Sequence, residues 1–280
     1  MAARVIVGVV AAVGIGLTAA CGSVPGSTDD ELRIAGSDTM LVLNRRLAEG
    51  YMRAHPGVVI RVKGGGTASG VEALVAGEVA VCAASRPLTA AEVQWMHDRH
   101  NTLGVRFPIA QDALSVWLHP ENPVASLTVA QLGSIFTGTV ANWKEVDGED
   151  REIVVVVRPP ASGTYRLFRD RVLAGLSYRT DAVTAVTTNQ VLETVAAEPA
   201  AIGYGGVAYT RPGVRTCAVD GVPPSAEALA GGDYPLARHL TLVTVAPPRG
   251  LARSFIDWCQ GSSGQALVAE VGYLPLWRRP

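Results

Sequence analysis

The sequence predicts an α/β fold in which mostly parallel strands lie buried beneath helices on both faces. Apolar, strand-like runs alternate with runs of helical periodicity along most of the chain. Several strand-like runs are apolar throughout, as is typical of strands covered on both sides. Turns rich in Ser, Thr and Gly lead from a strand-like run into a helix-like run at 36–40, 64–70 and 161–164.

The first half of the chain repeats the strand and helix pattern. A strand is expected at 32–35, and a helix follows at 41–53, where Leu43, Leu47 and Tyr51 have nearly helical spacing. The next predicted elements are, in chain order, a strand at 58–63, a helix at 71–76, a strand at 79–83 and a helix at 89–97.

The second half continues the pattern. Strand-like stretches lie around Ile109 and at 114–118, and a helix capped by Ser126 or Thr128 opens at 128–132. The remaining predicted elements are a strand at 153–157, a helix at 165–173, a short strand at 201–204, an apolar run at 240–246 and a helix at 252–259. A ligand of such a sheet is expected at the carboxyl ends of the strands, where the three turns lie.

The N-terminus predicts export. Arg4 precedes an unbroken apolar run at 5–17, which is too short to span a bilayer permanently, and small residues then lead to Cys21. A Cys at this place resembles the lipidation site of bacterial lipoproteins, although Thr18 stands where Leu is usual. We therefore expect a signal peptide at 1–20, lipidation of Cys21, a flexible tether at 21–31 and an extracytoplasmic, membrane-anchored protein. The alternative is a plain secretory signal with an incidental Cys.

Composition excludes several classes of protein. The formal net charge of −1 provides no basic excess for nucleic acid binding. Beyond Cys21, the odd set of Cys82, Cys217 and Cys259 has no metal-ligand spacing, and the five His residues form no metal-binding motif. We therefore expect no metal or other cofactor. One disulfide is possible, but the sequence does not say which pair would form it.

The three turns predict an oxyanion site. A strand that turns directly into a helix leaves the first N–H groups of that helix unpaired, and small hydroxyl side chains add donors without crowding a ligand. Each turn taken alone is equally compatible with ordinary helix capping. Three such turns in one chain favour one anion held by several helix N-termini.

Several motifs also occur in an order typical of a known family. They are GSDTM, the GGG-x-x-x-G turn, ASRPL at 84–88, SLTVAQLGSIFTGTVANWKEV at 126–146, RPPASGTYRLF at 158–168, AIGY at 201–204 and FIDWCQGSSGQALVAEVGYLPL at 255–276. Together they resemble the phosphate-binding proteins of phosphate-specific ABC transporters. The resemblance extends from about Leu32 to Leu276, and the 126–146 stretch is its most specific part.

This resemblance implies a two-lobed periplasmic-binding-protein fold of type II with a hinge between the lobes. Its expected lobes are 32–110 with 242–280, and 111–241. It also implies capture of inorganic phosphate outside the membrane and delivery to ABC permease subunits. The phosphate-binding residues that it implies are Ser37, Asp38, Thr39, Thr67, Ser69, Ser85, Arg86, Arg158, Ser162, Gly163 and Thr164.

The chain departs from the family at positions that carry charge. Well-studied members have carboxylates where this sequence has Arg86 and Pro160. Because phosphate near neutral pH keeps a proton, a site that rejects sulfate needs an acceptor carboxylate. We expect Asp38 to have this role, with helix capping as its alternative and Asp112 as the second candidate.

Other residues keep an ordinary structural alternative. Arg158 and Arg86 could bind phosphate oxygens through forked hydrogen bonds, or form salt bridges at the edge of a lobe. Trp143 is expected to pack in a core.

The sequence gives little support to catalysis. A serine nucleophile at Ser69 or Ser162 lacks the GxSxG and SxxK contexts, and the glycine-rich turn lacks the ending of a nucleotide-binding loop. We therefore expect a protein that is not an enzyme. A phosphate sensor or scavenger without a transport partner, or a binding protein for another tetrahedral oxyanion, remains an alternative.

Overall fold

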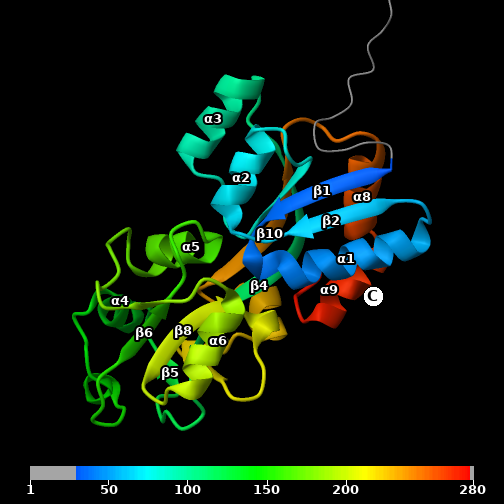
Figure 1. Cartoon of the computed structure of the whole chain (residues 1–280). Coiled ribbons are helices and arrows are strands. Elements are labelled where there is room, and N and C mark those ends of the chain that lie inside the picture. The colour runs from blue at the N-terminus through cyan, green and yellow to red at the C-terminus, as the bar shows by residue number, and fades with distance from the viewer. Residues whose placement is uncertain (1–29, 278–280) are drawn as a thin grey trace, which may run out of the picture.

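A computed structural model of the chain describes residues 30–277. The predicted signal peptide, Cys21 and nearly all of the tether lie outside the described residues. The described part forms a two-lobed α/β structure whose lobes are joined by β4 (Val105–Leu118) and β10 (Ala237–Thr244) (Figure 1). Within 30–277, no helix is long and apolar enough to cross a membrane.

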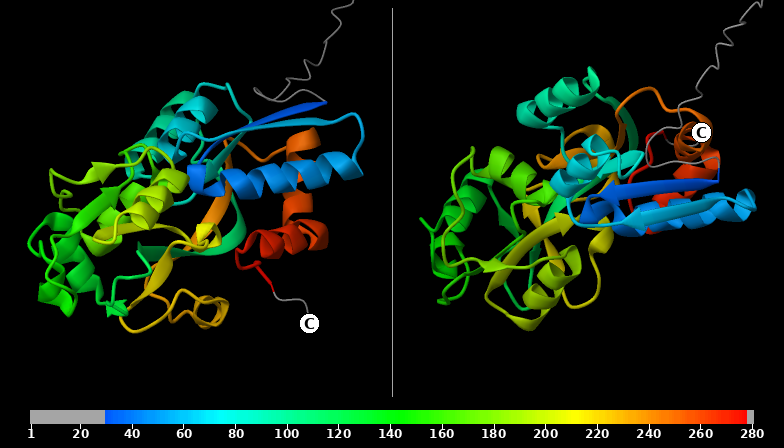
Figure 2. Two further views of the ribbon diagram at one scale, coloured as in Figure 1. Left: turned by 60° about the horizontal axis from the view of Figure 1, so that its bottom comes forward. Right: turned by 45° about the horizontal axis from the view of Figure 1, so that its top comes forward.

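The first lobe combines segments from both ends of the chain. Its strands are β1 (Glu31–Gly36), β2 (Val59–Lys63) and β3 (Val81–Ala84), followed across the sheet by β10. Its helices are α1 (Leu41–Ala54), α2 (Thr67–Val75), α3 (Ala90–His100), α8 (Gly250–Gln260) and α9 (Ser262–Val271). Figure 2 shows α1 beside the C-terminal helices, and these cover one face of the sheet while α2 and α3 cover the other.

The second lobe lies between the two joining strands in the sequence. Its strands are β5 (Ser126–Leu127), β6 (Val154–Val157), β7 (Val183–Thr184), β8 (Ala201–Gly206) and β9 (Arg215–Val219). Its α-helices are α4 (Val129–Thr137), α5 (Gly163–Val172), α6 (Thr188–Ala197) and α7 (Ala226–Gly231). Short 3₁₀ turns complete the structure at Asp38–Met40, Trp143–Val146 and Val207–Tyr209.

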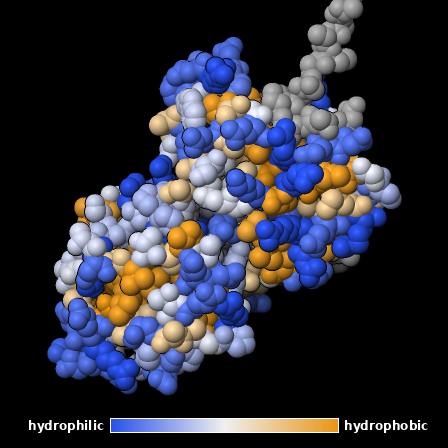
Figure 3. All heavy atoms as spheres, viewed as in Figure 1, coloured by the Kyte–Doolittle hydropathy of each residue, from blue (hydrophilic) through white to orange (hydrophobic). Residues whose placement is uncertain are grey.

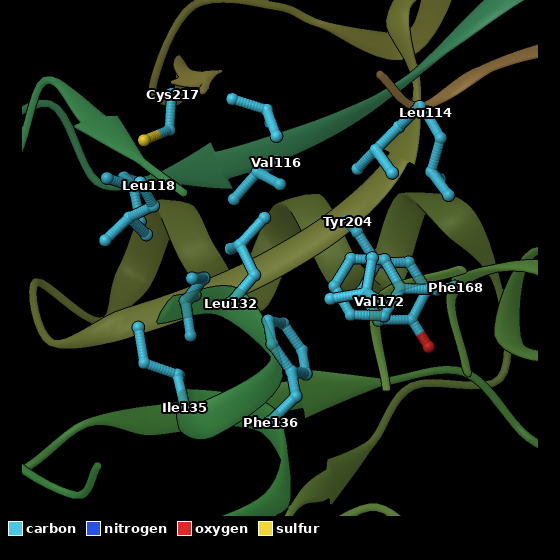
Figure 4. Packing of buried hydrophobic residues seen from close by; sticks show 14 of the residues in the cluster. Leu114, Val116, Leu118, Leu132, Ile135, Phe136, Phe168, Val172, Tyr204 and Cys217 are labelled. Atoms are coloured by element: carbon cyan, nitrogen blue, oxygen red, sulfur yellow. The ribbon is translucent and has the colours of Figure 1, made fainter. Parts of the chain in front are cut away.

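Aromatic side chains build much of the second lobe's core. Figure 4 shows Phe136, Phe168 and Tyr204 among aliphatic side chains, and the rings of Phe168 and Tyr204 stack with centroids 4.2 Å apart. Trp143 is also buried, and its indole N–H donates to the carbonyl of Ala200 at 2.8 Å. The interpretation of Trp143 as a packing residue is therefore confirmed.

The sheet is mixed rather than mostly parallel. Pairing is parallel on the flanks, where β2, β1 and β3 adjoin in one lobe and β8, β6 and β7 in the other. It is antiparallel where β10 meets β3 and β4, and where β4 meets β8 and β9. The antiparallel pairing of β4 with β10 arises because these two strands carry the chain between the lobes in opposite directions. The two strand-like stretches expected within 107–118 are parts of the one long strand β4.

Two helices begin earlier than the hydrophobic periodicity predicts. Helix α2 begins at Thr67 rather than Val71, and α5 begins at Gly163 rather than Tyr165. The polar turns therefore supply the first helical residues themselves, which brings their hydroxyl groups to the helix N-termini.

Hydrophilic residues cover much of the face shown in Figure 3, with separate hydrophobic patches in each lobe. Exposed apolar side chains on the described surface include Val42 of α1 and Val59 of β2. Scattered exposure of this kind is ordinary for a folded protein.

Candidate functional site

The three predicted turns meet where the two lobes face each other. Ser37, after β1, donates a hydrogen bond from its Oγ to the Oγ of Ser85, after β3, at 2.8 Å. Thr39 in the first lobe and Thr164 in the second share a hydrogen bond between their Oγ1 atoms at 2.9 Å. The backbone N–H of Ser85 donates to Thr67 Oγ1 at 3.3 Å. Residues far apart in the sequence thus form one cluster.

Gly163 brings the N-terminus of α5 directly onto these hydroxyl groups. A Cβ atom at Gly163 would lie 2.3 Å from Thr67 Oγ1 and 2.7 Å from Ser85 Oγ, so only glycine permits this approach. Ser162 caps the same helix by accepting a hydrogen bond from the N–H of Tyr165 at 3.4 Å. We call the following buried residues the hydroxyl cluster: Ser37, Thr39, Thr67, Ser85, Ser162 and Thr164.

A buried ion pair on the joining strands completes the cluster. Arg238 of β10 lies opposite Asp112 of β4, and its Nε donates to Asp112 Oδ2 at 2.7 Å. Its Nη1 donates to Thr164 Oγ1 at 3.0 Å. Asp112 Oδ1 accepts from the N–H of Val207 at 3.0 Å. Both side chains are almost completely buried, and the site therefore contains a carboxylate and a guanidinium besides the hydroxyl groups.

The electrostatics of this pair are dominated by burial. Burial raises the pKa of Asp112, while the positive charge and hydrogen bond of Arg238 lower it in part. Sequence reasoning considered Asp112 as a second candidate and missed Arg238. The available signal was a charged residue just before the apolar run 240–246, but its role depends on the pairing of β10 with β4.

Asp38 and Arg158 form a second ion pair, and this one crosses between the lobes. Arg158 Nη2 lies 3.4 Å from Asp38 Oδ2, and the same oxygen accepts the N–H of Thr188, the first residue of α6, at 3.0 Å. Arg158 also donates to Thr188 Oγ1 at 2.7 Å and to the carbonyl of Val186 at 2.9 Å. Burial lowers the pKa of Arg158, and the charge of Asp38 opposes that shift. Asp38 thus connects the first turn to a helix that the sequence did not predict.

Arg86 is directed to a partner within its own lobe. Its Nη2 donates to Glu92 Oε1 at 2.6 Å and its Nη1 to Glu92 Oε2 at 2.7 Å. Burial alone would raise the pKa of Glu92, but the hydrogen bonds from Arg86 and Thr89 outweigh it and hold the pKa below its ordinary value. This geometry matches the salt bridge considered as the alternative for Arg86.

Ser69 lies apart from the hydroxyl cluster. Its side chain is exposed, and its Oγ donates to the carbonyl of Gly65 at 3.2 Å. Because α2 begins at Thr67, Ser69 is already the third helical residue, and the turn of the helix carries it to another face. The structure therefore does not bring Ser69 to the predicted site.

The described residues show no arrangement typical of a metal centre. In 30–277, no group of three or more His, Cys, Asp or Glu is placed to hold a metal ion. Cys82, Cys217 and Cys259 are buried free thiols, so none of these three forms the disulfide that the sequence allowed. Burial raises the pKa of Cys217 to about 11 and that of Cys82 to about 12.

Comparisons with known proteins agree with this fold. Residues 23–262 match the model of the family described as PBP superfamily domain. The phosphate-binding protein PstS of Bacillus subtilis is 31% identical over 247 residues, which cover 88% of this chain and 80% of that protein. The PstS of Pseudomonas aeruginosa strain PAO1 is 28% identical over 88% of this chain and 83% of its own length.

Solved structures show the same architecture. A substrate-binding protein from Clostridium perfringens, solved with bound phosphate, has a TM-score of 0.81 at 28% identity and covers 89% of this chain and 100% of that chain. An ABC-type phosphate transport receptor from Vibrio cholerae has a TM-score of 0.74 at 27% identity, covering 87% of this chain and 99% of that one. The family and the two-lobed fold expected from the motifs are confirmed: the chain belongs to the PBP superfamily, in the family of the phosphate-binding protein PstS.

Proposed function

We propose that the protein binds inorganic phosphate outside the cell membrane and delivers it to an ABC transporter permease. The observation that carries this proposal is the meeting of hydroxyl groups from both lobes around the N-terminus of α5. Helix N-termini and hydroxyl donors together suit a small, multiply charged oxyanion. The PstS relatives and the phosphate-bound structure support phosphate as that anion.

A buried arginine nitrogen beside the contact between the lobes also supports an anionic ligand. Arg158 Nε is buried and has no hydrogen-bond partner among residues 30–277. Buried donors are usually paired in proteins, and a phosphate oxygen is a suitable acceptor. We therefore retain Arg158 as a proposed ligand residue, together with the hydroxyl cluster and Gly163. Asp38, Ser69 and Arg86 stay predictions of the motif resemblance.

We propose Asp112 as the carboxylate that accepts the phosphate proton. Asp38 lies at the contact between the lobes, whereas Asp112 is completely buried beside Arg238, which donates to Thr164 of the hydroxyl cluster. Asp112 Oδ1 accepts from Val207 and Oδ2 from Arg238, and each carboxylate oxygen has a second lone pair with which to accept the phosphate proton. Sulfate, which has no proton to donate at neutral pH, would face this carboxylate without a hydrogen bond and with like charge. This arrangement gives a physical basis for selecting phosphate.

The packing supports a division into lobes near the sequence expectation. Along β4, Ala110 belongs to the core of the first lobe and Ala113 to that of the second. Along β10, Ala237 packs against the core of the second lobe and Leu240 belongs to the core of the first. We propose that the chain bends at these positions when the lobes close over phosphate. The exact limits 32–110 with 242–280, and 111–241, remain predictions.

We also propose that the protein is held at the outer face of the membrane by a lipid on Cys21, and that it binds without catalysing a reaction. The apolar run at 5–17 and the small residues before Cys21 support the anchor. The related proteins are binding proteins, which supports a role without catalysis.

Calorimetric titration of the full-length protein, kept soluble in mild detergent, tests the ligand. After bound ligand is stripped, phosphate and arsenate should bind tightly while sulfate and molybdate give no response. Binding of sulfate or molybdate in preference to phosphate would favour another oxyanion, and no response to all four would refute the proposal. Phosphate uptake in cells lacking the protein then separates transport from sensing or scavenging.

A further inference from the structure

A second concave region adjoins the hydroxyl cluster. A pocket of about 590 Å³ lies on the surface of β4 and β10, between the segment after β3 and helix α5. In Figure 1, α2 and α3 of one lobe and α5 of the other lie on the same side of β10. We call the basic residues of this pocket the arginine vestibule: Arg86, Arg106, Arg171, Arg238 and His239.

The vestibule shares two residues with the neighbourhood of the proposed phosphate site. Arg238 lines the pocket and also donates to Thr164 Oγ1 at 3.0 Å, and its Nη1 lies 3.4 Å from the carbonyl oxygen of Ser85. Arg86 lines the pocket and directly follows Ser85. Both arginines are buried, and Arg238 connects the vestibule to the hydroxyl cluster through Thr164.

The outer part of the vestibule carries positive charge that no carboxylate offsets. Arg86 is paired with Glu92, and Arg238 with Asp112. Within residues 30–277, no ion pair involves Arg106 or Arg171. Arg171 donates to the carbonyl of Ala237, which leaves its charge in place. Burial and the nearby charge of Arg238 both lower the pKa of Arg171, consistent with cations gathered in a small space.

The size of the pocket determines what this charge can do. A cavity of about 590 Å³ is within the range that holds a drug-sized molecule, so it cannot surround a phosphate ion closely. A phosphate ion there would keep much of its hydration and exchange rapidly. Clefts lined by charge of one sign nevertheless concentrate counter-ions and accelerate their association. The chain as a whole has a net charge of −1, so the effect is local.

We propose that the arginine vestibule is an electrostatic capture site that concentrates oxyanions of the phosphate class beside the hydroxyl cluster and accelerates their binding. Arg106 and Arg171 supply the unpaired charge, while Arg238 lies between the captured anion and the final site. The inference rests on the proposed phosphate function and adds a kinetic step to it.

Stopped-flow association of phosphate with the full-length protein tests the vestibule. The double variant Arg106→Gln and Arg171→Gln should lower the association rate constant about 3- to 10-fold at low ionic strength, because two steering charges are lost. The dissociation rate constant should stay within about twofold of the wild type, since the hydroxyl cluster is intact. The difference should vanish near 1 M salt, where the screening length is about 3 Å.

The matched control is the double variant Arg45→Gln and Arg53→Gln, which removes two exposed arginines from α1 on the opposite face of the first lobe. Its rate constants should equal those of the wild type. The single variant Arg106→Gln guards against misfolding, because no hydrogen bond involves the Arg106 side chain within 30–277. Its association rate constant should fall by about half as much, on a logarithmic scale, as that of the double variant.

Each contrary outcome has a distinct meaning. A wild-type protein that binds no phosphate would refute the proposed function itself. If the wild type binds but the vestibule variant associates at the same rate, the capture site is refuted. It is also refuted if only the dissociation rate rises, or if titration shows a second phosphate per chain that the variant loses without slower association.

Discussion

Two arginine and carboxylate pairs flank the hydroxyl cluster, and they belong to different parts of the molecule. Asp112 and Arg238 lie on the two joining strands, with an Oδ2 to Nη2 distance of 2.6 Å and almost no exposure. Asp38 and Arg158 lie in opposite lobes, 3.4 Å apart, and Asp38 keeps 15% of its side chain exposed. We call the first pair the hinge pair, because it joins the two strands that are proposed to bend, while the second is formed where the lobes meet. The two carboxylates therefore differ in their place in the fold, and only Asp38 connects one lobe to the other.

The largest expected effect is on stability, at the hinge pair. Asp112→Ala would leave Arg238 buried without its partner, and such a loss costs about 3 to 5 kcal/mol. Urea unfolding should show this fall in the free energy of unfolding. The double variant Asp112→Ala and Arg238→Met removes the buried charge as well and should recover part of the loss. A cost below about 1 kcal/mol would show that Arg238 finds another partner or water.

Arg158→Ala should weaken phosphate binding by roughly 2 to 5 kcal/mol, as is typical when one side of a buried charged contact is truncated. The fold should survive, because Arg158 lies between the lobes and not within one core. Calorimetric titration measures the loss. Arg211→Ala is the matched control, since Arg211 is an exposed arginine of the same lobe whose Nη2 lies 3.7 Å from Glu193. Equal phosphate affinity in the Arg158 variant and the wild type would contradict the proposed contact.

Selectivity distinguishes the two carboxylates most sharply. Asp112→Asn removes the negative charge from the proposed proton acceptor, so phosphate affinity should fall and sulfate affinity should rise. A tenfold shift in their ratio corresponds to about 1.4 kcal/mol. Asp38→Asn should weaken both anions by a similar factor, because it affects only the contact between the lobes. Competition titrations at neutral pH measure both ratios.

The opposite result has a clear meaning. If Asp38→Asn shifts the ratio while Asp112→Asn leaves it unchanged, the sequence prediction for Asp38 is correct and the hinge pair has only a structural role. Thermal melts of both variants should accompany the titrations, since the Asp112 side chain is buried.

Local patterns predicted the parts of the fold and the site that depend on neighbouring residues. The three turns could be found because each joins a strand-like run to a helix within a few residues, and α1 because its apolar spacing is regular. Helix α6 was missed although its sequence carries local signals, a capping box of Thr187 and Gln190 followed by Val191, Leu192 and Val195 at helical spacing. The contact between Thr188 and Asp38 was therefore missed as well.

Arg238 could not be assigned from the sequence because its function depends on strand register. It is 126 positions from Asp112, and only the antiparallel pairing of β10 with β4 places the two opposite each other. Strand pairing also explains why the mixed sheet was missed. A helix between two strands predicts that they run parallel, but it does not show that a distant strand such as β10 lies beside β3 and β4 and pairs with them in the antiparallel sense. Arg86 shows the converse: its match to a motif position suggested a ligand contact, and Glu92 six residues later accepts its hydrogen bonds instead.

The smallest expected effect concerns a third arginine and carboxylate pair, Arg86 and Glu92, which lies within the first lobe. Hydrogen bonds from Arg86 and Thr89 hold the pKa of Glu92 below the ordinary value of 4.5, so ionised Glu92 stabilises the folded state. This contribution is fully present above pH 4.5 and is lost as the pH falls through the lowered pKa. Glu92→Gln should therefore lower stability at neutral pH, and its difference from the wild type should shrink on acidification.

Urea unfolding of both proteins between pH 3 and pH 7 measures this difference. Phosphate affinity should change less than twofold in the variant, because the Glu92 pair lies outside the hydroxyl cluster. A marked rise in affinity would show that releasing Arg86 from Glu92 allows it to bind the anion. Arg86 would then join Arg158 as a ligand residue. The Glu92 pair could then no longer be described as one that only supports the first lobe.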